Sequence, residues 1–258
     1  MIVLGLDTAT QATAVALRLS DGRTLQVRDD PSPGDHPGHA TRLLDLAREL
    51  LAEAGVAWSE VGRIAVGVGP GTFTGLRVGV ATARGLAQSL SAQLVGVSSL
   101  QALAAVALSD GAGTGEDGSS IPDAVLAVID ARRGEVFAAA YERDGAAYES
   151  HRLTVPRALA PQELGGVVAS AEGGSGQPRR WLAVGDGALR YRPDLATASV
   201  PCAEDSSPLH RVSAGAICEL GERARAATGP EQVLPEYCRR PDAELALATA
   251  AGAPAGAS

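Results

Sequence analysis

The sequence predicts two α/β domains of similar topology, each with a mixed sheet and flanking helices. Residues 4–28 and 127–151 share one pattern, in which an apolar strand ends at an aspartate, Asp7 or Asp130, and an Asp-Gly turn begins 14 residues later. Asp-Gly between alternating apolar runs is a strong hairpin signal. Each half is therefore expected to open with three strands, followed by alternating strands and helices.

The first half then reads as helix, strand, helix, strand, helix. Apolar residues at helical spacing predict a helix over 39–54, with Gly55 as its left-handed cap. Further elements are expected as a strand over 63–68, a helix over 75–90, a strand over 94–97 and a helix over 100–108. In the second half the patterns predict a helix over 161–170, a strand over 181–184, and a long helix over 212–227 ended by Gly229-Pro230.

Composition sets the domain limits. Two stretches without periodicity, 109–123 and 172–178, are rich in Gly, Ser and Asp and are expected to be loops. We therefore assign residues 1–108 to the first domain, 109–123 to a flexible linker and 124–242 to the second domain. Residues 243–258 are rich in Ala, Gly and Pro and are expected to form a disordered tail.

Charge and cysteine usage exclude several classes of protein. The net charge is −8, and an acidic surface repels a phosphate backbone, so binding to nucleic acid by this chain alone is not expected. No apolar run reaches the ~18 residues of a membrane span, and the N-terminus has no basic segment typical of a signal peptide. The three cysteines lack metal-type spacing, which favours reduced thiols in a cytoplasmic protein.

The stretch GPGTFTGLR, residues 69–77, follows an apolar strand and suggests a phosphate-binding loop. A Walker A loop needs Lys-Ser/Thr directly after its second Gly, but Leu76-Arg77 follow Gly75. A dinucleotide-binding loop counted from Gly69 needs Gly at position 74, which is Thr74. Both familiar phosphate motifs are therefore absent.

The helix after this loop has one face almost without side chains. Gly75, Gly79, Ala83 and Ala87 recur at every fourth position, and a helical Gly costs up to ~1 kcal/mol relative to Ala. The face therefore serves close packing, either against a helix of a partner or against this chain's own sheet. The sequence favours neither alternative.

The remaining candidates for chemistry are weak. His36 and His39 flank Pro37-Gly38 in a segment that is not helical, so His39 is expected to start a helix, and no metal site is expected. Asp7 and Asp130 end strands where kinases of two-domain α/β folds place a phosphate-directing Asp. The Gly that normally follows such an Asp is missing, so both are interpreted as turn caps.

The order and sequence of several stretches resemble the bacterial TsaB (YeaZ) family. They are LGLDTAT at the N-terminus, HATRLL at 39–44, GVGPGTFTGLRVGVATARGLA at 67–87, VGVSSLQALA at 95–104, IDARRGEVFAAAY at 129–141 and PEYCRRP at 235–241. The resemblance implies two tandem ribonuclease-H-like domains of the actin/sugar-kinase/chaperone ATPase class (ASKHA fold). It also implies a non-catalytic subunit for N6-threonylcarbamoylation of adenosine 37 in tRNAs that read ANN codons.

The resemblance further implies partners. The catalytic subunit TsaD would bind the first two helices, the isolated chain would form a homodimer through much the same face, and the ATPase TsaE would dock nearby, with tRNA bound only by the complex. TsaD carries a helical metal site whose histidines are replaced here by Ser99 and Leu103, so no catalytic residue is expected. The alternative is an active nucleotide-dependent ATPase or kinase of the same fold.

Two sets of site residues follow from the resemblance. The expected partner or dimer interface comprises His39, Leu43, Leu46, Leu50, Phe73, Gly75, Arg77, Val78, Gly79, Thr82, Ala83 and Leu86. No cofactor is expected on the chain alone. ATP or ADP with magnesium could lie at the assembled interface, near Asp7, Thr8, Thr10, Gly71 and Thr72.

Overall fold

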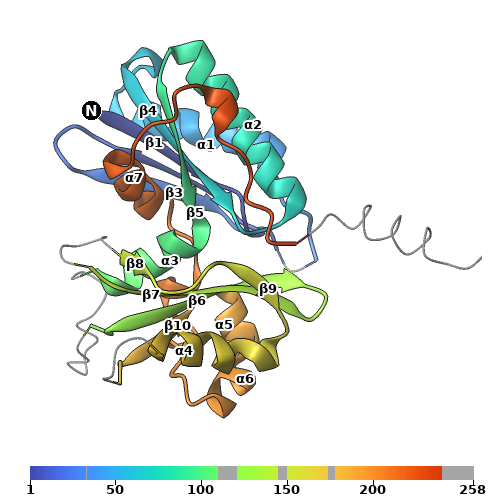
Figure 1. The fold of residues 1–258 in the computed structure, drawn as a ribbon. Helices are drawn as coiled ribbons and strands as arrows, with labels where there is room; N and C mark the ends of the chain where they lie inside the picture. Colours follow the sequence, from blue (N-terminus) through green and yellow to red (C-terminus); the bar gives the residue numbers. More distant parts are fainter. Residues whose placement is uncertain (33, 110–120, 145–149, 174–177, 240–258) are drawn as a thin grey trace, which may run out of the picture.

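Two five-stranded sheets lie one above the other, with two helices between them (Figure 1). The computed structural model describes residues 1–32, 34–109, 121–144, 150–173 and 178–239. The tail assigned to 243–258, most of the linker assigned to 109–123 and most of the loop at 172–178 lie outside the described residues.

The first sheet has the order β3-β2-β1-β4-β5. Its strands are β1 (Ile2–Asp7), β2 (Thr13–Arg18), β3 (Thr24–Asp29), β4 (Val61–Gly69) and β5 (Gln93–Ser98). β2 is antiparallel to β1 and β3, and β4 is parallel to β1 and β5. The predicted hairpin at Asp21-Gly22 is confirmed, and Gly22 has the positive φ of 91° that favours glycine in such turns.

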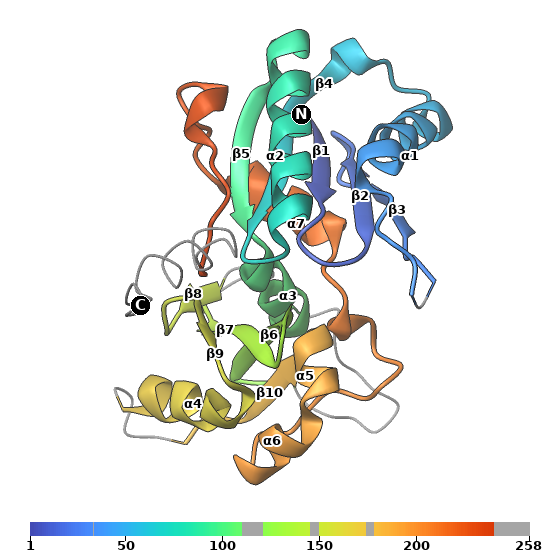
Figure 2. The ribbon, with the colours of Figure 1, turned by 90° about the vertical axis from the view of Figure 1, so that its right-hand side faces the viewer.

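Helices α1 (His39–Ala54) and α2 (Phe73–Leu90) cover one face of this sheet (Figure 2). The predicted bounds of α1 are confirmed, and Gly55 ends this helix with φ 65°. The predicted end of α2 is also confirmed, but the helix begins at Phe73, two residues before the start expected from the residue pattern. Their inward leucines and alanines pack with β1, β2 and β4 in one core cluster. A short 3-10 helix, Trp58–Glu60, leads into β4.

The second sheet repeats the first four strands of the first. Its order is β10-β6-β7-β8, with β9 also paired to β7, for strands β6 (Ala124–Arg132), β7 (Glu135–Arg143), β8 (Ser150–Arg152), β9 (Arg157–Leu159) and β10 (Trp181–Val184). The repeat is thus confirmed for these strands. The second Asp-Gly turn, at 144–145, extends outside the described residues.

The outer face of the second sheet is covered by short helices: α4 (Leu164–Glu172), α5 (Asp186–Arg190) and α6 (Arg192–Thr197). The helix predicted over 161–170 begins as a 3-10 turn, Pro161–Glu163, and continues as α4. Further 3-10 turns occur at Pro208–His210 and Pro230–Gln232.

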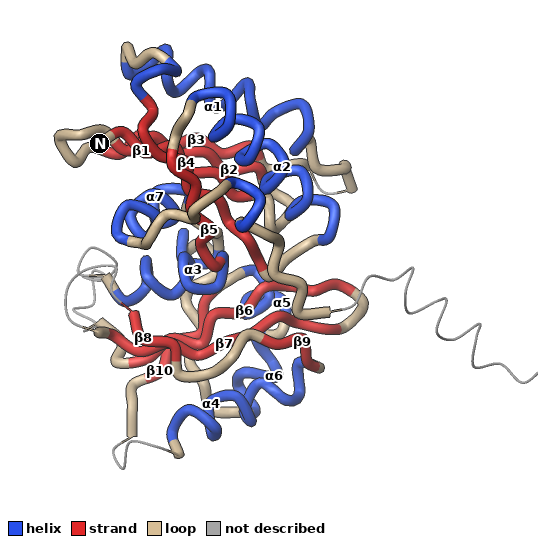
Figure 3. Tube along the Cα trace, turned by 45° about the horizontal axis from the view of Figure 1, so that its top comes forward, coloured by secondary structure: helices blue, strands red, loops and turns tan. Residues whose placement is uncertain are grey.

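The two sheets share one core through α3 (Ser99–Leu108) and α7 (Ala214–Arg223), which lie between them (Figure 3). α3 packs on β6 and β7, whereas α7 packs on β1, β2 and β4. The prediction of a long second-domain helix over 212–227 is therefore wrong in two respects. The helix ends at Arg223, and it belongs to the first sheet.

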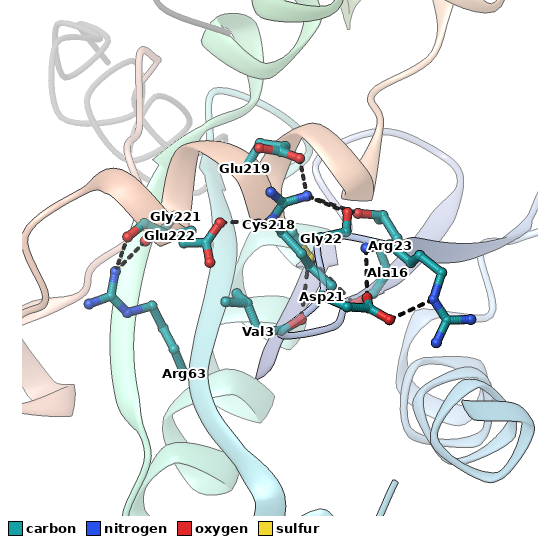
Figure 4. A network of polar contacts seen from close by, with 12 residues as sticks. Val3, Ala16, Asp21, Gly22, Arg23, Arg63, Cys218, Glu219, Gly221 and Glu222 are labelled. Carbon is teal, nitrogen blue, oxygen red and sulfur yellow. Dashed lines mark hydrogen bonds and ion pairs between the residues drawn. The ribbon is translucent and has the colours of Figure 1, made fainter. Parts of the chain in front are cut away.

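Polar contacts fix α7 to that sheet (Figure 4). Arg63 on β4 donates to the carbonyls of Gly221, Glu222 and Ala224, which satisfies the last carbonyls of the helix. Arg18 on β2 pairs with Glu219 and Glu222, the latter at 2.7 Å. Because of these contacts, the assignment of all of 124–242 to the second domain needs correction.

Residues 224–239, here called the C-terminal strap, also return to the first sheet. The backbone N–H groups of Ala227 and Glu236 donate to Leu94 and Val68, and Arg84 of α2 donates to the carbonyls of Glu231 and Val233. The strap therefore runs beside α2 toward the second sheet (Figure 1). Within the described part of the chain, no helix has the length and apolar character needed to cross a membrane.

Candidate functional site

The turn after β1, where a phosphate-binding turn was considered, is closed by its own contacts. Asp7 is only 1% exposed, and its Oδ1 accepts the backbone N–H of Ala9 at 3.0 Å. The Ser99 hydroxyl donates to Oδ2 at 2.7 Å. Burial raises the pKa of the Asp7 carboxyl, against the opposing effect of these hydrogen bonds. The interpretation of Asp7 as a turn cap is confirmed.

The bare face of α2 holds this turn. Thr8 donates its hydroxyl to the Gly75 carbonyl at 2.7 Å, and the Thr72 N–H donates to the Ala9 carbonyl at 2.8 Å. A Cβ on Gly75 would lie 2.0 Å from the Thr8 carbonyl oxygen, and one on Gly79 would lie 2.3 Å from Thr8 Oγ1. The glycines therefore serve close packing inside this chain, which decides between the two alternatives left open by the sequence.

This packing corrects part of the expected interface. Gly75, Gly79 and Ala83 face the turn and the sheet, and Leu43, Leu46 and Leu50 lie in the core below α1. None of these six residues is presented to a partner, because each is buried by this chain. Asp7 and Thr8 are also buried, so neither is exposed to a nucleotide.

His39 begins α1, as predicted, and is 5% exposed. Its Nδ1 is 2.9 Å from the Thr13 hydroxyl, whereas Nε2 has no hydrogen-bond partner. Burial lowers the pKa of the imidazole and so favours its neutral form. Among the described residues no group of three or more His, Cys, Asp or Glu side chains could hold a metal ion.

The outward face of the two helices carries the rest of the expected interface. Arg77 is exposed, and Phe73, Val78, Thr82 and Leu86 are half-buried. The Arg77 guanidinium lies 3.7 Å from the centroid of the Phe73 ring, and that ring contacts Tyr237 of the strap with centroids 5.1 Å apart. Sequence reasoning missed Leu44, which is 46% exposed on α1. The sequence signal for its exposure was its position in the helix, where Leu44 lies between the inward-facing positions Leu43 and Leu46.

A cavity of about 260 Å³ lies where the N-terminus of α2, the β6–β7 turn and the strap meet. The lining includes Gly71, Thr72, Phe73 and Asp130, all of which were considered for a site from the sequence. It also includes residues that were not: Ala131, Arg132, Arg133, Phe137, Tyr237, Cys238 and Arg239. Thr10 lies elsewhere, in a second cavity of about 270 Å³ with Asp186 and His210. Of the residues grouped as nucleotide-proximal, Gly71 and Thr72 therefore line one cavity and Thr10 another, while Asp7 and Thr8 are buried in the turn after β1.

The β6–β7 turn beside the first cavity is held by two aspartates. Asp130 Oδ1 accepts the N–H of Arg132 at 2.9 Å, as expected for a turn cap. The N–H of Asp130 in turn donates to Asp186 Oδ1 at 3.0 Å. Burial raises the pKa of Asp186 to about 6, and the neighbouring Asp130 carboxylate adds to the shift.

The fold defines the class first. A ROK hexokinase from Thermus thermophilus superposes with a TM-score of 0.50 at 16% identity, over 86% of this chain and all of that one, which shows that this chain has the fold of a sugar kinase. Two solved structures from Pseudomonas aeruginosa, YeaZ and a protein similar to it, give TM-scores of 0.69 and 0.71 at 30% and 31% identity, covering 92% of this chain and 99% of each.

The sequence comparisons narrow the class to a family. The Escherichia coli tRNA threonylcarbamoyladenosine biosynthesis protein TsaB is 32% identical over 81% of this chain and 85% of its own length. A family model described as TsaD, tRNA N6-adenosine threonylcarbamoyltransferase, matches residues 36–163. The chain belongs to the TsaB family.

Proposed function

We propose that this chain is a non-catalytic scaffold that binds and activates the threonylcarbamoyltransferase TsaD in the N6-threonylcarbamoylation of tRNA adenosine. The family name supports the pathway, and the match to the transferase model indicates a shared ancestry with the catalytic subunit. In this proposal tRNA binds only to the assembled complex in the cytoplasm, TsaE docks on that complex, and the free chain pairs with itself.

One observation carries the scaffold proposal: the turn after β1 is filled from within. In a kinase of this fold class the turn would receive phosphate, but here Thr8 and Ala9 bond to the first turn of α2 and Asp7 is buried against Ser99. The residues at this turn do not fit a magnesium nucleotide, since the carboxylate that would direct the metal is covered. The same contacts fix α2 in place, and a rigid helix binds a partner at a lower entropic cost.

The outward face of α1 and α2 is the surface that we propose for TsaD. Leu44, Val78 and Leu86 place apolar side chains on this face, and the helices themselves are anchored by the core beneath them. Association would then bury apolar area without changing the fold of this chain. Leu44 and Val78 are suited to mutation because neither belongs to the buried core.

Co-purification with TsaD tests the proposal. Leu44→Glu and Val78→Glu, alone and together, should abolish both the capture of TsaD and the threonylcarbamoyl transfer by the complex. The melting temperature of each variant should stay within about 2 °C of the wild type. Arg23→Glu, on the exposed β2–β3 turn, is the matched charge control and should retain capture. Full capture of TsaD by the double variant would refute the proposal that TsaD binds the outward face of α1 and α2. Turnover of magnesium-ATP by the isolated chain would refute the non-catalytic role.

Gly79→Leu is unsuitable as an interface variant, although Gly79 is among the interface residues expected from the resemblance. A Cβ at position 79 already lies 2.3 Å from Thr8 Oγ1, so leucine there would disturb the fold before it disturbed an interface.

A further inference from the structure

The C-terminal strap ends within the stretch PEYCRRP, which the proposed function does not use. Its described residues link the two halves of the molecule. The N–H of Glu236 donates to the Val68 carbonyl on β4 at 2.7 Å. The Arg239 guanidinium pairs with Glu135, at the start of β7, at 2.6 Å. Tyr237 lies between these two attachments, so its backbone is held on both sides.

The Tyr237 side chain reaches the first two turns of α2, at the edge of the proposed partner face. Its ring centroid lies 5.1 Å from that of Phe73, and its hydroxyl accepts the Nε–H of Arg77 at 3.1 Å. The Arg77 guanidinium lies 3.7 Å from the centroid of the Phe73 ring. The chain has only two phenylalanines and four tyrosines, yet one of each meets here, with Tyr237 42% exposed. These three side chains form one group, here called the Arg77 cluster.

Arg77 is exposed, but its guanidinium is held in one orientation by the other two members of the cluster. Stacking on an aromatic ring and a hydrogen bond from Nε restrict the rotamers of the side chain, so less entropy is lost when it binds a partner. In the part of the chain that the structure describes, Arg77 forms no ion pair, and its two terminal nitrogens donate to no other group. The sequence of α2 contains no Asp or Glu that could neutralise it.

These properties are those of a binding hot spot for a negatively charged group. Arginine and tyrosine are enriched among the interface residues whose loss weakens binding most. A guanidinium with free terminal N–H groups binds a carboxylate through two parallel hydrogen bonds. The two rings beside Arg77 would shield such a pair from water and so strengthen it. The chemistry of the cluster therefore fits an Asp or Glu side chain of the partner.

We propose that Arg77 binds a carboxylate of the transferase TsaD at the edge of the α1–α2 face, and that Tyr237 is a positioning residue that orients Arg77 for this contact. The inference rests on the proposed function, because it assigns the chemistry of one part of that face. It also gives the strap a role in partner binding, although Tyr237 lies 160 positions from Arg77 in sequence.

The affinity of the full chain for TsaD, measured by calorimetry, tests the role of Arg77. Arg77→Ala should raise the Kd about 30-fold or more, as expected for a hot-spot arginine. Arg77→Lys should restore little of this loss, because an ammonium group forms no pair of parallel hydrogen bonds. Arg23→Ala, on the exposed β2–β3 turn, is the matched control and should bind as the wild type does.

The dependence of the Kd on salt tests whether Arg77 meets a charge. Salt screens a pair of opposite charges, so the Kd of the wild type should rise more steeply with salt concentration than that of Arg77→Ala. An equal dependence on salt in the two proteins would overturn the assignment of a carboxylate.

A double-mutant cycle tests whether Tyr237 acts through Arg77. Tyr237→Ala alone should raise the Kd about five- to ten-fold, and Tyr237→Phe by less, because the ring contact with Phe73 remains. In the Arg77→Ala background, Tyr237→Ala should change the Kd by less than about two-fold. At saturating TsaD, Tyr237→Ala should leave the rate of threonylcarbamoyl transfer unchanged, since only binding is affected.

Two results would overturn the inference. Wild-type affinity of Arg77→Ala would remove the carboxylate contact, and additive losses from Arg77→Ala and Tyr237→Ala would remove the positioning role. The Leu44→Glu/Val78→Glu variant keeps the proposed function separate. Loss of TsaD by that variant alone would refute only the role of the Arg77 cluster, whereas full binding by both would refute the α1–α2 face. Melting of Arg77→Ala and Tyr237→Phe within about 2 °C of the wild type shows that the losses are local.

Discussion

The close approach of Thr8 to Gly79 predicts opposite outcomes for two Gly→Ala substitutions in one helix. Alanine at an exposed helical glycine is worth up to ~1 kcal/mol through helix propensity. Gly85 on α2 is exposed, and a Cβ there meets nothing within 4 Å, so Gly85→Ala should stabilise the protein by roughly 0.5–1 kcal/mol. At Gly79 the same methyl would lie 2.3 Å from Thr8 Oγ1, which is inside van der Waals contact.

The magnitude at Gly79 follows from these two terms. Overpacking in a well-packed interior costs about 1–3 kcal/mol of stability, whereas the gain of about 1 kcal/mol from helix propensity is the same at both positions. Gly79→Ala should therefore be less stable than Gly85→Ala by about 1–3 kcal/mol, although the chemical change is identical. Urea unfolding monitored by circular dichroism measures both values under one set of conditions.

A double-mutant cycle with Thr8→Ala isolates the contact. Thr8→Ala alone removes the hydrogen bond to the Gly75 carbonyl and should cost about 1 kcal/mol. In its presence Gly79→Ala should lose most of its penalty, because the Thr8 hydroxyl that it meets has gone, which gives a coupling of about 1 kcal/mol or more. Equal stabilisation by Gly79→Ala and Gly85→Ala would refute the close packing of α2 on the β1–β2 turn.

Three further predictions concern titration, helix capping and thiol access. Burial raises the pKa of Asp186 to about 6 in the folded chain, against 3.8 in the unfolded chain. Protonated Asp186 therefore stabilises the fold by about 3 kcal/mol below pH 4, and this contribution is lost as the pH rises to 6. Asp186→Asn should flatten the dependence of urea stability on pH between pH 4 and 6, and an unchanged pH dependence would contradict this. Arg63→Ala should lower the free energy of unfolding by about 2–3 kcal/mol and speed amide exchange in α7, since three carbonyls lose their donor. Arg23→Ala, exposed at a turn, should change the free energy of unfolding by less than about 0.5 kcal/mol. Slow amide exchange in α7 of the Arg63 variant would show that the cap is dispensable. Cys218 is fully buried, and burial raises the pKa of its thiol to about 12, so it should react with a thiol reagent only after unfolding; rapid labelling of the native chain at this residue would show that α7 opens.

Local sequence signals located most of the elements. The bounds of α1, the C-terminal end of α2 and the strand Trp181–Val184 are predictable because apolar periodicity and capping residues act over a few positions. The repeat of strand patterns also gave the paired sheets. The same signals overextended α7 to residue 227, because the donor that ends the helix, Arg63, lies 158 residues away from Gly221 in sequence.

The candidate sites show the same division. The spacing of the glycines in GPGTFTGLR excludes the two standard phosphate-binding motifs. It leaves two alternatives for what packs against the bare face of α2. The choice between them depended on where the β1–β2 turn lies in space, and Thr8 and Ala9 proved to be the partner. The sequence predicted no cavity at the N-terminus of α2, because the residues that line it come from positions 71–73, 130–137 and 237–239.

The sequence by itself determined the class of fold, the repeat, the family resemblance and the close packing of the α2 face that carries Gly75, Gly79, Ala83 and Ala87, since each depends on patterns of a few residues. Only the tertiary structure decided what packs on that face, which sheet α7 joins and which residues line the cavity at the N-terminus of α2. Those outcomes depend on contacts between residues far apart in the chain, and such contacts are selected by the packing of the whole core rather than by any local propensity.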